Sequence, residues 1–235
     1  MNYPLDPIAV IRSPYREKFA TPRQPGLTPS VRAIVEFYPG FCPPEAVRGL
    51  EGFSHIWLLF LFHQNWQKGW QPTVRPPRLG GNKRVGVYAS RSPFRPNPIG
   101  LSAVKLLGID CTEGRATLEI EGADLIDGTP VLDIKPYLPY GDSIADARGG
   151  FAEKAPGEQL VVEFSPEAMI DLQHYQAVSP RLKMMICETL VLDPRPAYQR
   201  NDNSQREYGM LLEAYNVRWQ VRENVALVTR ILPAE

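Results

Sequence analysis

Two arginines held between prolines are the first residues in this chain whose spacing indicates a binding site. The segment Arg91-Ser92-Pro93-Phe94-Arg95-Pro96-Asn97-Pro98-Ile99-Gly100 has three prolines within six residues, which fix the directions of Arg91 and Arg95. A planar guanidinium suits phosphate, carboxylate or a stacked base, and a rigid loop loses little entropy on binding. The segment 19–26 likewise sets an arginine and a glutamine between prolines. Both are candidate recognition loops; the alternative for the first is a purely structural turn, which would not need both arginines.

Carboxylates that could take part in acid–base chemistry occur in the segment Asp124–Tyr137. Its Asp-Gly-Thr-Pro turn at Asp127–Pro130 is ordinary hairpin chemistry and needs no functional explanation by itself. Asp133 and Lys135, two residues apart on the strand that follows, are expected to share one face. The segment is therefore a second candidate for the site.

Basic residues are concentrated in one part of a chain whose formal net charge is zero. The acid-free window, Gly52–Ile109, spans 58 residues with eight Lys or Arg and no Asp or Glu, and it holds three of the four tryptophans. Basic side chains interleaved with aromatic rings are typical of proteins that bind single-stranded RNA. We expect Trp66 and Trp70 to be exposed, whereas Trp57, Phe60 and Phe62 are expected to fill the core. The alternative is that acidic residues of the C-terminal half fold back and neutralise the window.

Several chemistries are excluded by motifs that the sequence lacks. No GxG, GxxxxGK[ST] or GxSxG occurs, which argues against a Rossmann dinucleotide site, a P-loop and a hydrolase elbow. The three histidines form no HExxH, and the three cysteines form no CxxC, so no metal is expected and the thiols suit a reducing cytoplasm. The longest apolar run, Ile56–Phe62, is too short to span a membrane, and the N-terminus has no signal-peptide pattern.

Short apolar runs separated by Gly, Pro, Asn and Asp predict a mainly β fold with a small antiparallel β-barrel as its N-terminal domain. Fifteen of the 24 prolines fall in the first hundred residues, which leaves little room for long helices there. A short helical turn is expected at Pro43–Gly49. The predicted strands are Ile8–Ile11, Val31–Phe37, Ile56–Phe62, Val85–Tyr88, Leu101–Leu107, Ala116–Ile120, Val131–Ile134 and Leu160–Phe164.

After Phe164 the pattern changes to a small α+β C-terminal domain, which divides the chain into 1–164 and 165–235. Ser165-Pro166 and Ser179-Pro180 each resemble a helix N-cap followed by proline at the first helical position. The second helix should end before Asp193-Pro194 and bury an apolar stripe at helical spacing. That stripe is Leu182, Met185, Ile186 and Leu190, and the strands that follow are expected at Glu207–Leu212, Asn216–Val221 and Asn224–Ile231.

With these motifs in view, the chain closely resembles the bacterial TsaA-like (TrmO-type) family of S-adenosylmethionine-dependent tRNA methyltransferases. The resemblance is carried by VIRSPYREKFATPRQPGL, AVRGLEGFSHIWLLFLFHQ, TVRPPRLGGNKRVGVYASRSPFRPNPIG, DLIDGTPVLDIKPYLPY and DPRPAY. It implies methylation of the exocyclic amine of threonylcarbamoyladenosine, next to the anticodon, by a homodimer with an N-terminal β-barrel. By motif position it also implies a cofactor site made of Pro22, Arg23, Gln24, His63, Gln64, Arg91, Leu101, Asp127, Gly128, Thr129 and Pro130.

Transfer of a methyl group from a sulfonium to nitrogen is an in-line displacement, so the main task is to hold donor and acceptor together. A carbamoylated exocyclic nitrogen is a poor nucleophile, and a carboxylate that removes its proton would help. Asp127 is the first candidate for this base and Asp133 the second. Arg78, Lys83, Arg84 and Arg95 are expected to hold the backbone of the anticodon stem-loop.

Two other functions remain open on the sequence. A non-catalytic RNA-binding barrel would explain the charge and the aromatic residues equally well, and cofactor binding separates it from the methyltransferase. A small-molecule enzyme that uses S-adenosylmethionine would explain the arginine loops, but it leaves the acid-free window without a purpose.

Overall fold

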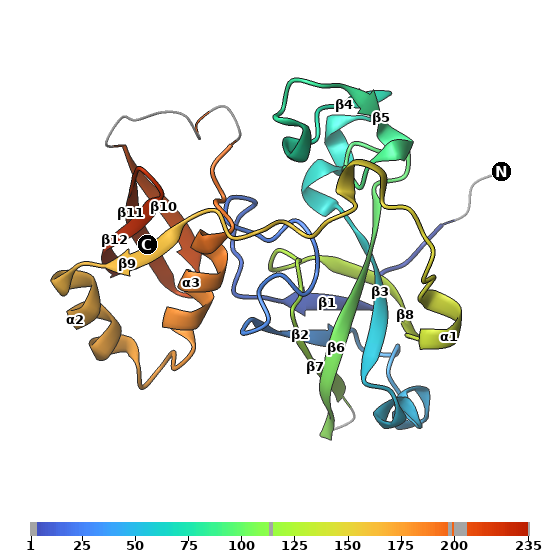
Figure 1. Ribbon diagram of the computed structural model, residues 1–235. Helices are drawn as coiled ribbons and strands as arrows, with labels where there is room; N and C mark the ends of the chain where they lie inside the picture. Colours follow the sequence, from blue (N-terminus) through green and yellow to red (C-terminus); the bar gives the residue numbers. More distant parts are fainter. Residues whose placement is uncertain (1–3, 113–114, 197–198, 200–205, 235) are drawn as a thin grey trace.

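The N-terminal half of the computed structural model forms a closed antiparallel barrel of six strands, as predicted (Figure 1). The structure describes residues 4–112, 115–196, 199 and 206–234. Around the barrel the strand order is β1-β2-β7-β6-β3-β8. The bounds are β1 Ala9–Arg12, β2 Arg32–Phe37, β3 His55–Leu61, β6 Ile99–Thr112, β7 Arg115–Glu121 and β8 Pro130–Pro136.

Side chains alternate between the inside and the outside of the barrel, because successive residues of a strand point to opposite faces. In β3 this places Ile56, Leu58 and Phe60 inside, where they are almost completely buried. They pack with apolar residues from the other five strands into one core. Trp57 is a correction to our expectation: it is half-buried on the outer side of β3, where its Nε1 donates to Asp142 at 2.9 Å.

Much of the acid-free window forms short elements above one end of the barrel (Figure 1). The run Val85–Tyr88, expected as one strand, is instead a two-residue strand followed by a 3-10 turn. The elements are β4 Thr73–Val74, β5 Val85–Gly86 and the 3-10 turns η3 His63–Lys68, η4 Pro77–Leu79 and η5 Val87–Ala89. Elsewhere the helical turns are η1 Pro44–Val47, within the predicted Pro43–Gly49, η2 Leu50–Gly52, α1 Pro139–Asp142 and η6 Gly150–Ala152.

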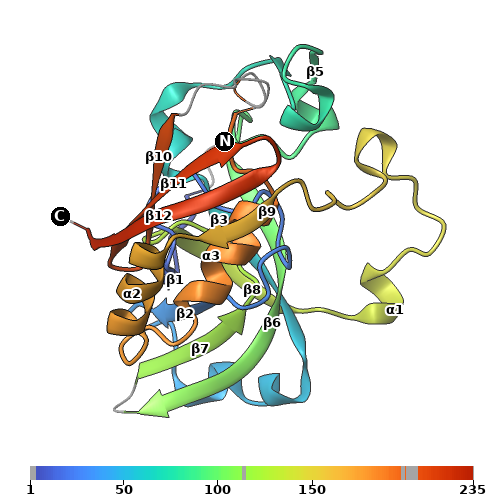
Figure 2. The ribbon, with the colours of Figure 1, turned by 60° about the vertical axis from the view of Figure 1, so that its left-hand side comes forward.

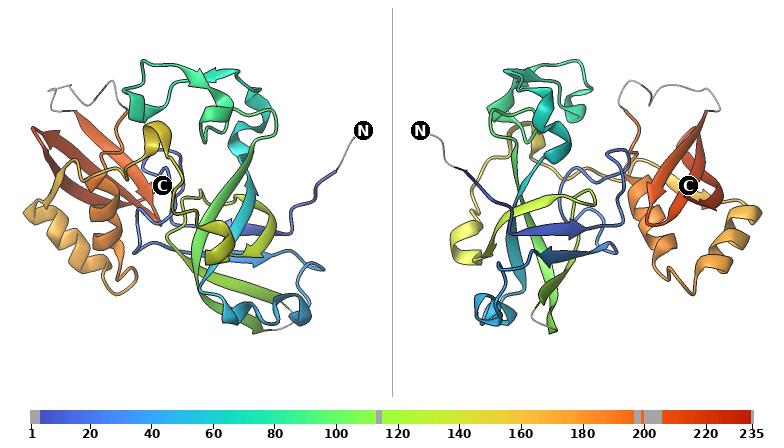
Figure 3. Two further views of the ribbon diagram at one scale, coloured as in Figure 1. Left: turned by 45° about the vertical axis from the view of Figure 1, so that its right-hand side comes forward. Right: turned by 180° about the vertical axis from the view of Figure 1, so that it is seen from behind.

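The C-terminal domain is a four-stranded sheet in the order β10-β11-β12-β9, against which two helices pack (Figure 2). An extended connection leads to it from the barrel (Figure 3). β9 pairs in parallel with β12, so it belongs to this sheet, whereas the division at residue 164 left it with the barrel. The bounds are β9 Val161–Phe164, α2 Pro166–Tyr175, α3 Leu182–Val191, β10 Glu207–Leu212, β11 Tyr215–Arg222 and β12 Val225–Pro233.

The two helices bear out one of the two predicted N-caps. Ser165 caps α2, since its side chain accepts a hydrogen bond from the backbone of Ala168 at 3.1 Å. Ser179 does not cap α3: its hydroxyl donates to Glu213, and the helix begins at Leu182 with Arg181 in the cap position. The predicted apolar stripe of α3 is buried, and the helix ends before Asp193 as expected.

The loop after β1 belongs to the core of the C-terminal domain rather than to the barrel (Figure 1). Tyr15 and Ala20 are buried in that core, and Phe19 stacks on Trp219 with ring centroids 6.5 Å apart. Polar contacts at both ends hold the loop further: the backbone of Leu211 donates to Glu17 at 3.0 Å, and that of Ser30 to Glu188 at 2.9 Å. We call residues 15–31 the bridging loop.

None of the described helices is long and apolar enough to cross a membrane.

Candidate active site

The proline-rich segment lies where β3 ends and β6 begins. The two strands are paired, with Leu61 opposite Ile99, and the backbone of Phe62 donates to Pro98 at 2.8 Å. His63 and Gln64 follow directly at the start of η3. A Cβ on Gly100 would lie 2.2 Å from the ring of Phe60, so the glycine of this motif is explained by packing. The barrel thus brings 63–64 and the start of β6 to the same end.

The bridging loop reaches this same end of the barrel through Gln24. The guanidinium of Arg91 donates to the side-chain oxygen of Gln24, which joins two of the expected cofactor segments. Gly26 donates its backbone N–H to Gly122 at 2.8 Å, which fixes the loop against the end of β7. Lys18 donates to the buried side chain of Asn65, so the loop is also tied to η3.

Burial and charge lower the proton affinity of two basic groups here. The pKa of His63 lies below its ordinary value, first because burial disfavours the imidazolium and then because Lys18 is near. Burial, followed by the charge of Lys68, lowers the pKa of Lys18 as well. His63 is therefore mainly neutral at pH 7 and adds no positive charge to the site.

Asp124 lies near Arg91 at this end of the barrel, and the sequence did not single it out as a site residue. Its carboxylate accepts a hydrogen bond from the hydroxyl of Ser102 at 2.7 Å, and Ser102 is buried on β6 next to Leu101. Burial raises the pKa of Asp124 to about 6, against the opposing effects of Ser102 and the charge of Arg91. The only signal in the sequence was its place at the start of DLIDGTP, because Ser102 and Arg91 are distant along the chain.

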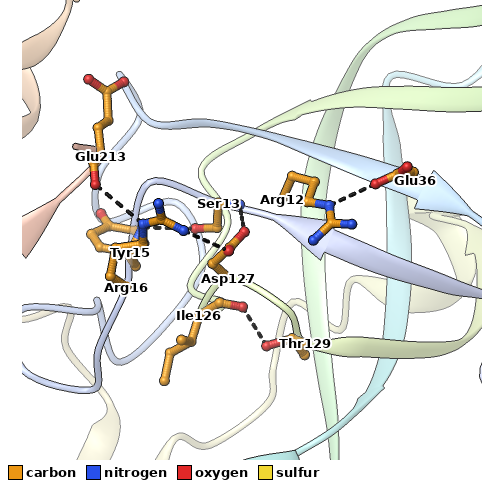
Figure 4. A network of polar contacts seen from close by, with 9 residues as sticks. All are labelled: Arg12, Ser13, Tyr15, Arg16, Glu36, Ile126, Asp127, Thr129 and Glu213. Carbon is orange, nitrogen blue, oxygen red and sulfur yellow. Dashed lines mark hydrogen bonds and ion pairs between the residues drawn. The ribbon is translucent and has the colours of Figure 1, made fainter.

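Asp127, the first candidate base, holds the start of the bridging loop (Figure 4). One carboxylate oxygen accepts from the backbone of Ser13 at 3.0 Å, and the other pairs with Arg16 at 3.1 Å. The remaining residues of the turn contact β1 or their own turn: Gly128 donates to Ile11 at 2.9 Å. Both oxygens of Asp127 are thus engaged by donors that order the chain after β1.

Asp133, the second candidate, lies on the outer surface of the barrel. On this surface Asp133 is opposite Leu59, which is opposite Leu101 on the next strand. Two strand spacings, about 10 Å, therefore separate Asp133 from Leu101. Leu101 is 51% exposed, and the only ion pair of Asp133 among the described residues is with Lys135, at 2.8 Å. Asp133 thus shares a surface with one of the expected cofactor residues.

The four basic residues expected to contact RNA differ in what they bind. Arg95 donates to the backbone carbonyls of Val87 and Ser90, at 3.0 and 2.8 Å, and Arg78 donates to carbonyls of the 152–154 segment. Arg84 donates to a threonine hydroxyl, and Lys83 is exposed. The acceptors of these hydrogen bonds are uncharged, so the arginines keep their positive charge. The contacts of Arg78 and Arg95 with backbone carbonyls also stabilise the surrounding loops.

The acid-free window remains positively charged in the folded protein. Among the described residues its only ion pair joins Lys105 and Glu121, at 3.0 Å, so no other basic residue of the window is directly paired with an acid there. Trp66 and Trp70 are 60% and 52% exposed, as predicted. No group of three or more His, Cys, Asp or Glu in the described part of the chain could hold a metal ion.

Comparison with known proteins identifies the family. Residues 10–143 match the model of the tRNA-methyltransferase O N-terminal domain, and residues 157–234 match that of the TrmO C-terminal domain. The chain is 48% identical, over 94% of both chains, to the tRNA (adenine(37)-N6)-methyltransferase of Escherichia coli K12. It is also 48% identical, over 93% of both chains, to the putative S-adenosylmethionine-dependent methyltransferase RcsF of Pseudomonas aeruginosa.

A solved structure shares the whole fold. The crystal structure of TrmO from Pseudomonas aeruginosa superposes with a TM-score of 0.82 at 39% identity, covering 98% of each chain. The matches to both domain models, to the two relatives and to the solved structure all indicate the same family. The chain is therefore a member of the tRNA-methyltransferase O family.

Proposed function

We propose that this protein methylates the exocyclic N6 of adenosine 37 in tRNA, next to the anticodon, with S-adenosylmethionine as the methyl donor. Within that activity we propose threonylcarbamoyladenosine as the acceptor. The observation that carries the proposal is the convergence of Gln24, Arg91 and the start of β6 beside the exposed tryptophans of the acid-free window, in a chain of this family.

The side chains at this end of the barrel fit S-adenosylmethionine chemically. Bound there, the cofactor would supply a methyl group on a positively charged sulfur. Its methionine part carries a carboxylate, which the planar fork of Arg91 suits, and Gln24 holds that fork in place. Leu101 offers exposed apolar surface for a ring or a ribose. A neutral His63 avoids repulsion of the cationic sulfur.

The protein's main contribution to the transfer is position. An in-line displacement gains up to ~7–11 kcal/mol when both reactants are held at near-attack distance, provided that the groups which hold them are rigid. Here the prolines around Arg91 and the anchoring of the bridging loop in the C-terminal core supply that rigidity.

For removal of the acceptor's proton we propose Asp133 before Asp127. Asp133 shares the outer surface of Leu101, whereas the oxygens of Asp127 are occupied by Ser13 and Arg16. General-base assistance of this kind contributes ~10²–10⁴ in rate. In this assignment Asp127 is a positioning residue that orders the bridging loop.

The acid-free window is the proposed binding surface for the anticodon stem-loop. Lys83 and Arg84, together with the charge of Arg78 and Arg95, would hold phosphates, and Trp66 and Trp70 would stack on unpaired bases. We further propose that the enzyme works in the cytoplasm, where its substrate is found, and as a homodimer. Light scattering of the purified protein tests the dimer.

Transfer of labelled methyl from S-adenosylmethionine into tRNA tests the function directly. The tRNA is taken from cells that lack this gene, and the matched control is tRNA without the threonylcarbamoyl group. Incorporation into the threonylcarbamoylated pool alone is the expected result. Equal incorporation into both pools would overturn the proposed acceptor, and no incorporation with cofactor binding intact would point to another acceptor. Binding of tRNA without binding of the cofactor would point to a non-catalytic RNA-binding barrel.

A further inference from the structure

Asp124 is a mostly enclosed carboxylate with few compensating contacts. Among the described residues, its carboxylate accepts a hydrogen bond from the hydroxyl of Ser102 at 2.7 Å and one from its own backbone N–H, and both donors are neutral. Arg91 is near enough for its charge to be felt, but no ion pair within 4.0 Å joins the two in the described part of the chain. The other titratable group that faces Asp124 is Tyr15, which is buried in the C-terminal core and hydrogen-bonded to Thr28.

Such a group is unfavourable for the fold. Burial of a carboxylate costs free energy unless a cation or enough donors compensate it, and one hydroxyl with one backbone N–H does so only in part. The raised pKa of Asp124, about 6, expresses this incomplete compensation. At pH 7 the side chain is nevertheless mainly ionised, so the native protein holds an undercompensated negative charge at this end of the barrel. Groups of this kind cluster at functional sites.

The position of Asp124 indicates what would compensate it. Its hydrogen-bond donor Ser102 lies on the inner face of β6, near the start of that strand, and its neighbour Arg91 donates to Gln24. Asp124 therefore lies beside one expected cofactor residue, Arg91, and close to a second, Gln24. Arg91 suits the anionic end of S-adenosylmethionine, whereas the cationic atoms need a carboxylate. Asp127 and Asp133 are already paired with Arg16 and Lys135, and Asp124 has no ion pair among the described residues. We infer that the carboxylate of Asp124 binds a cationic group of S-adenosylmethionine, and this inference rests on the proposed function.

Calorimetric titration of Asp124→Asn with S-adenosylmethionine tests the inference. Asparagine keeps the size of the side chain and the acceptor for Ser102 but removes the charge. We expect cofactor binding to weaken about 10- to 100-fold, the usual worth of a hydrogen bond to a charged group. The matched control is Glu121→Gln, which removes a nearby carboxylate that pairs with Lys105 instead, and its affinity should equal that of the wild type.

A thermal melt at pH 7.5 separates binding from folding. If the charge of Asp124 helps to bind the cofactor but destabilises the folded protein, the melting temperature of Asp124→Asn is no lower than that of the wild type, although the variant binds S-adenosylmethionine more weakly. Titration with S-adenosylhomocysteine, which keeps the ammonium but lacks the sulfonium charge, then identifies the partner: equal losses indicate the ammonium, and a loss confined to S-adenosylmethionine indicates the sulfonium.

Three results would overturn the inference. An affinity of Asp124→Asn within twofold of the wild type would show that the charge is not used, and an equal loss in Glu121→Gln would show that the effect is not local. A lower melting temperature of Asp124→Asn would indicate a structural role. If the wild type itself bound neither compound, the proposed function would fail first, and the inference with it.

Discussion

The partly buried carboxylate of Asp124 predicts an unusual dependence of stability on pH. Its pKa is about 6 in the folded protein and 3.8 as the ordinary value, so between these values the native state keeps a proton that the unfolded chain has lost. Stability from this group is therefore full below pH 3.8 and is lost as the pH rises through 6. Two pKa units correspond to about 3 kcal/mol in total, of which about 2 kcal/mol is lost between pH 4.5 and 7.5.

Asp124→Asn removes this titration and isolates its contribution. Urea denaturation of wild type and variant across pH 4.5–7.5 gives two free energies of unfolding at each pH, and their difference cancels the other carboxylates. As the pH rises from 4.5 to 7.5, the free energy of unfolding of the variant should increase by about 2 kcal/mol relative to that of the wild type. The groups that face Asp124 do not titrate there, because arginine stays charged and burial raises the pKa of Tyr15 further. A difference independent of pH, or a wild type that gains on the variant as the pH rises, would refute the reasoning.

Four further substitutions test other parts of the structure. Gly100→Ala forces a methyl group against the ring inside the barrel and should lower the free energy of unfolding by about 1–3 kcal/mol in urea denaturation, whereas an unchanged value would contradict the packing at this position. Trp66→Ala and Trp70→Ala should each weaken tRNA binding by ~1–3 kcal/mol in a filter-binding assay, with Tyr140→Ala, an exposed ring outside the window, as the unaffected control. Glu188→Gln weakens the hydrogen bonds from Ser30 that anchor the bridging loop, at a cost of about 1 kcal/mol. The KM for S-adenosylmethionine should therefore rise about fivefold, while kcat and the KM for tRNA stay the same. A change in kcat alone would count against this positioning role.

Local patterns in the sequence predict most of the elements because those elements depend on local physics. Alternation in Ile56–Phe62 gives β3, and the apolar spacing from Leu182 to Leu190 gives the buried side of α3. The first residue of α3 differs from the prediction because the hydroxyl of Ser179 is used by Glu213, which is 34 residues further along the chain. A cap motif cannot show such a competitor.

Partners that the fold brings together from distant positions could not be predicted. Val161–Phe164 is a strand on its own pattern, but only the tertiary structure pairs it with β12. Asp124 stands out only through its hydrogen bond from Ser102, which is 22 residues earlier in the chain and is brought next to it by the fold. The resemblance to a family named the expected cofactor residues, yet their arrangement and the occupied oxygens of Asp127 are visible only in the folded chain.

The bridging loop makes the C-terminal domain sensitive to what happens at the barrel. Because Tyr15 and Ala20 are part of the C-terminal core while Gln24 contacts Arg91, the loop cannot open at one end without disturbing the other. Local opening of the loop and of the C-terminal core is therefore expected to be one cooperative event in native-state hydrogen exchange. A ligand held by Gln24 would then slow amide exchange in α3 and β11, in a domain that it does not touch.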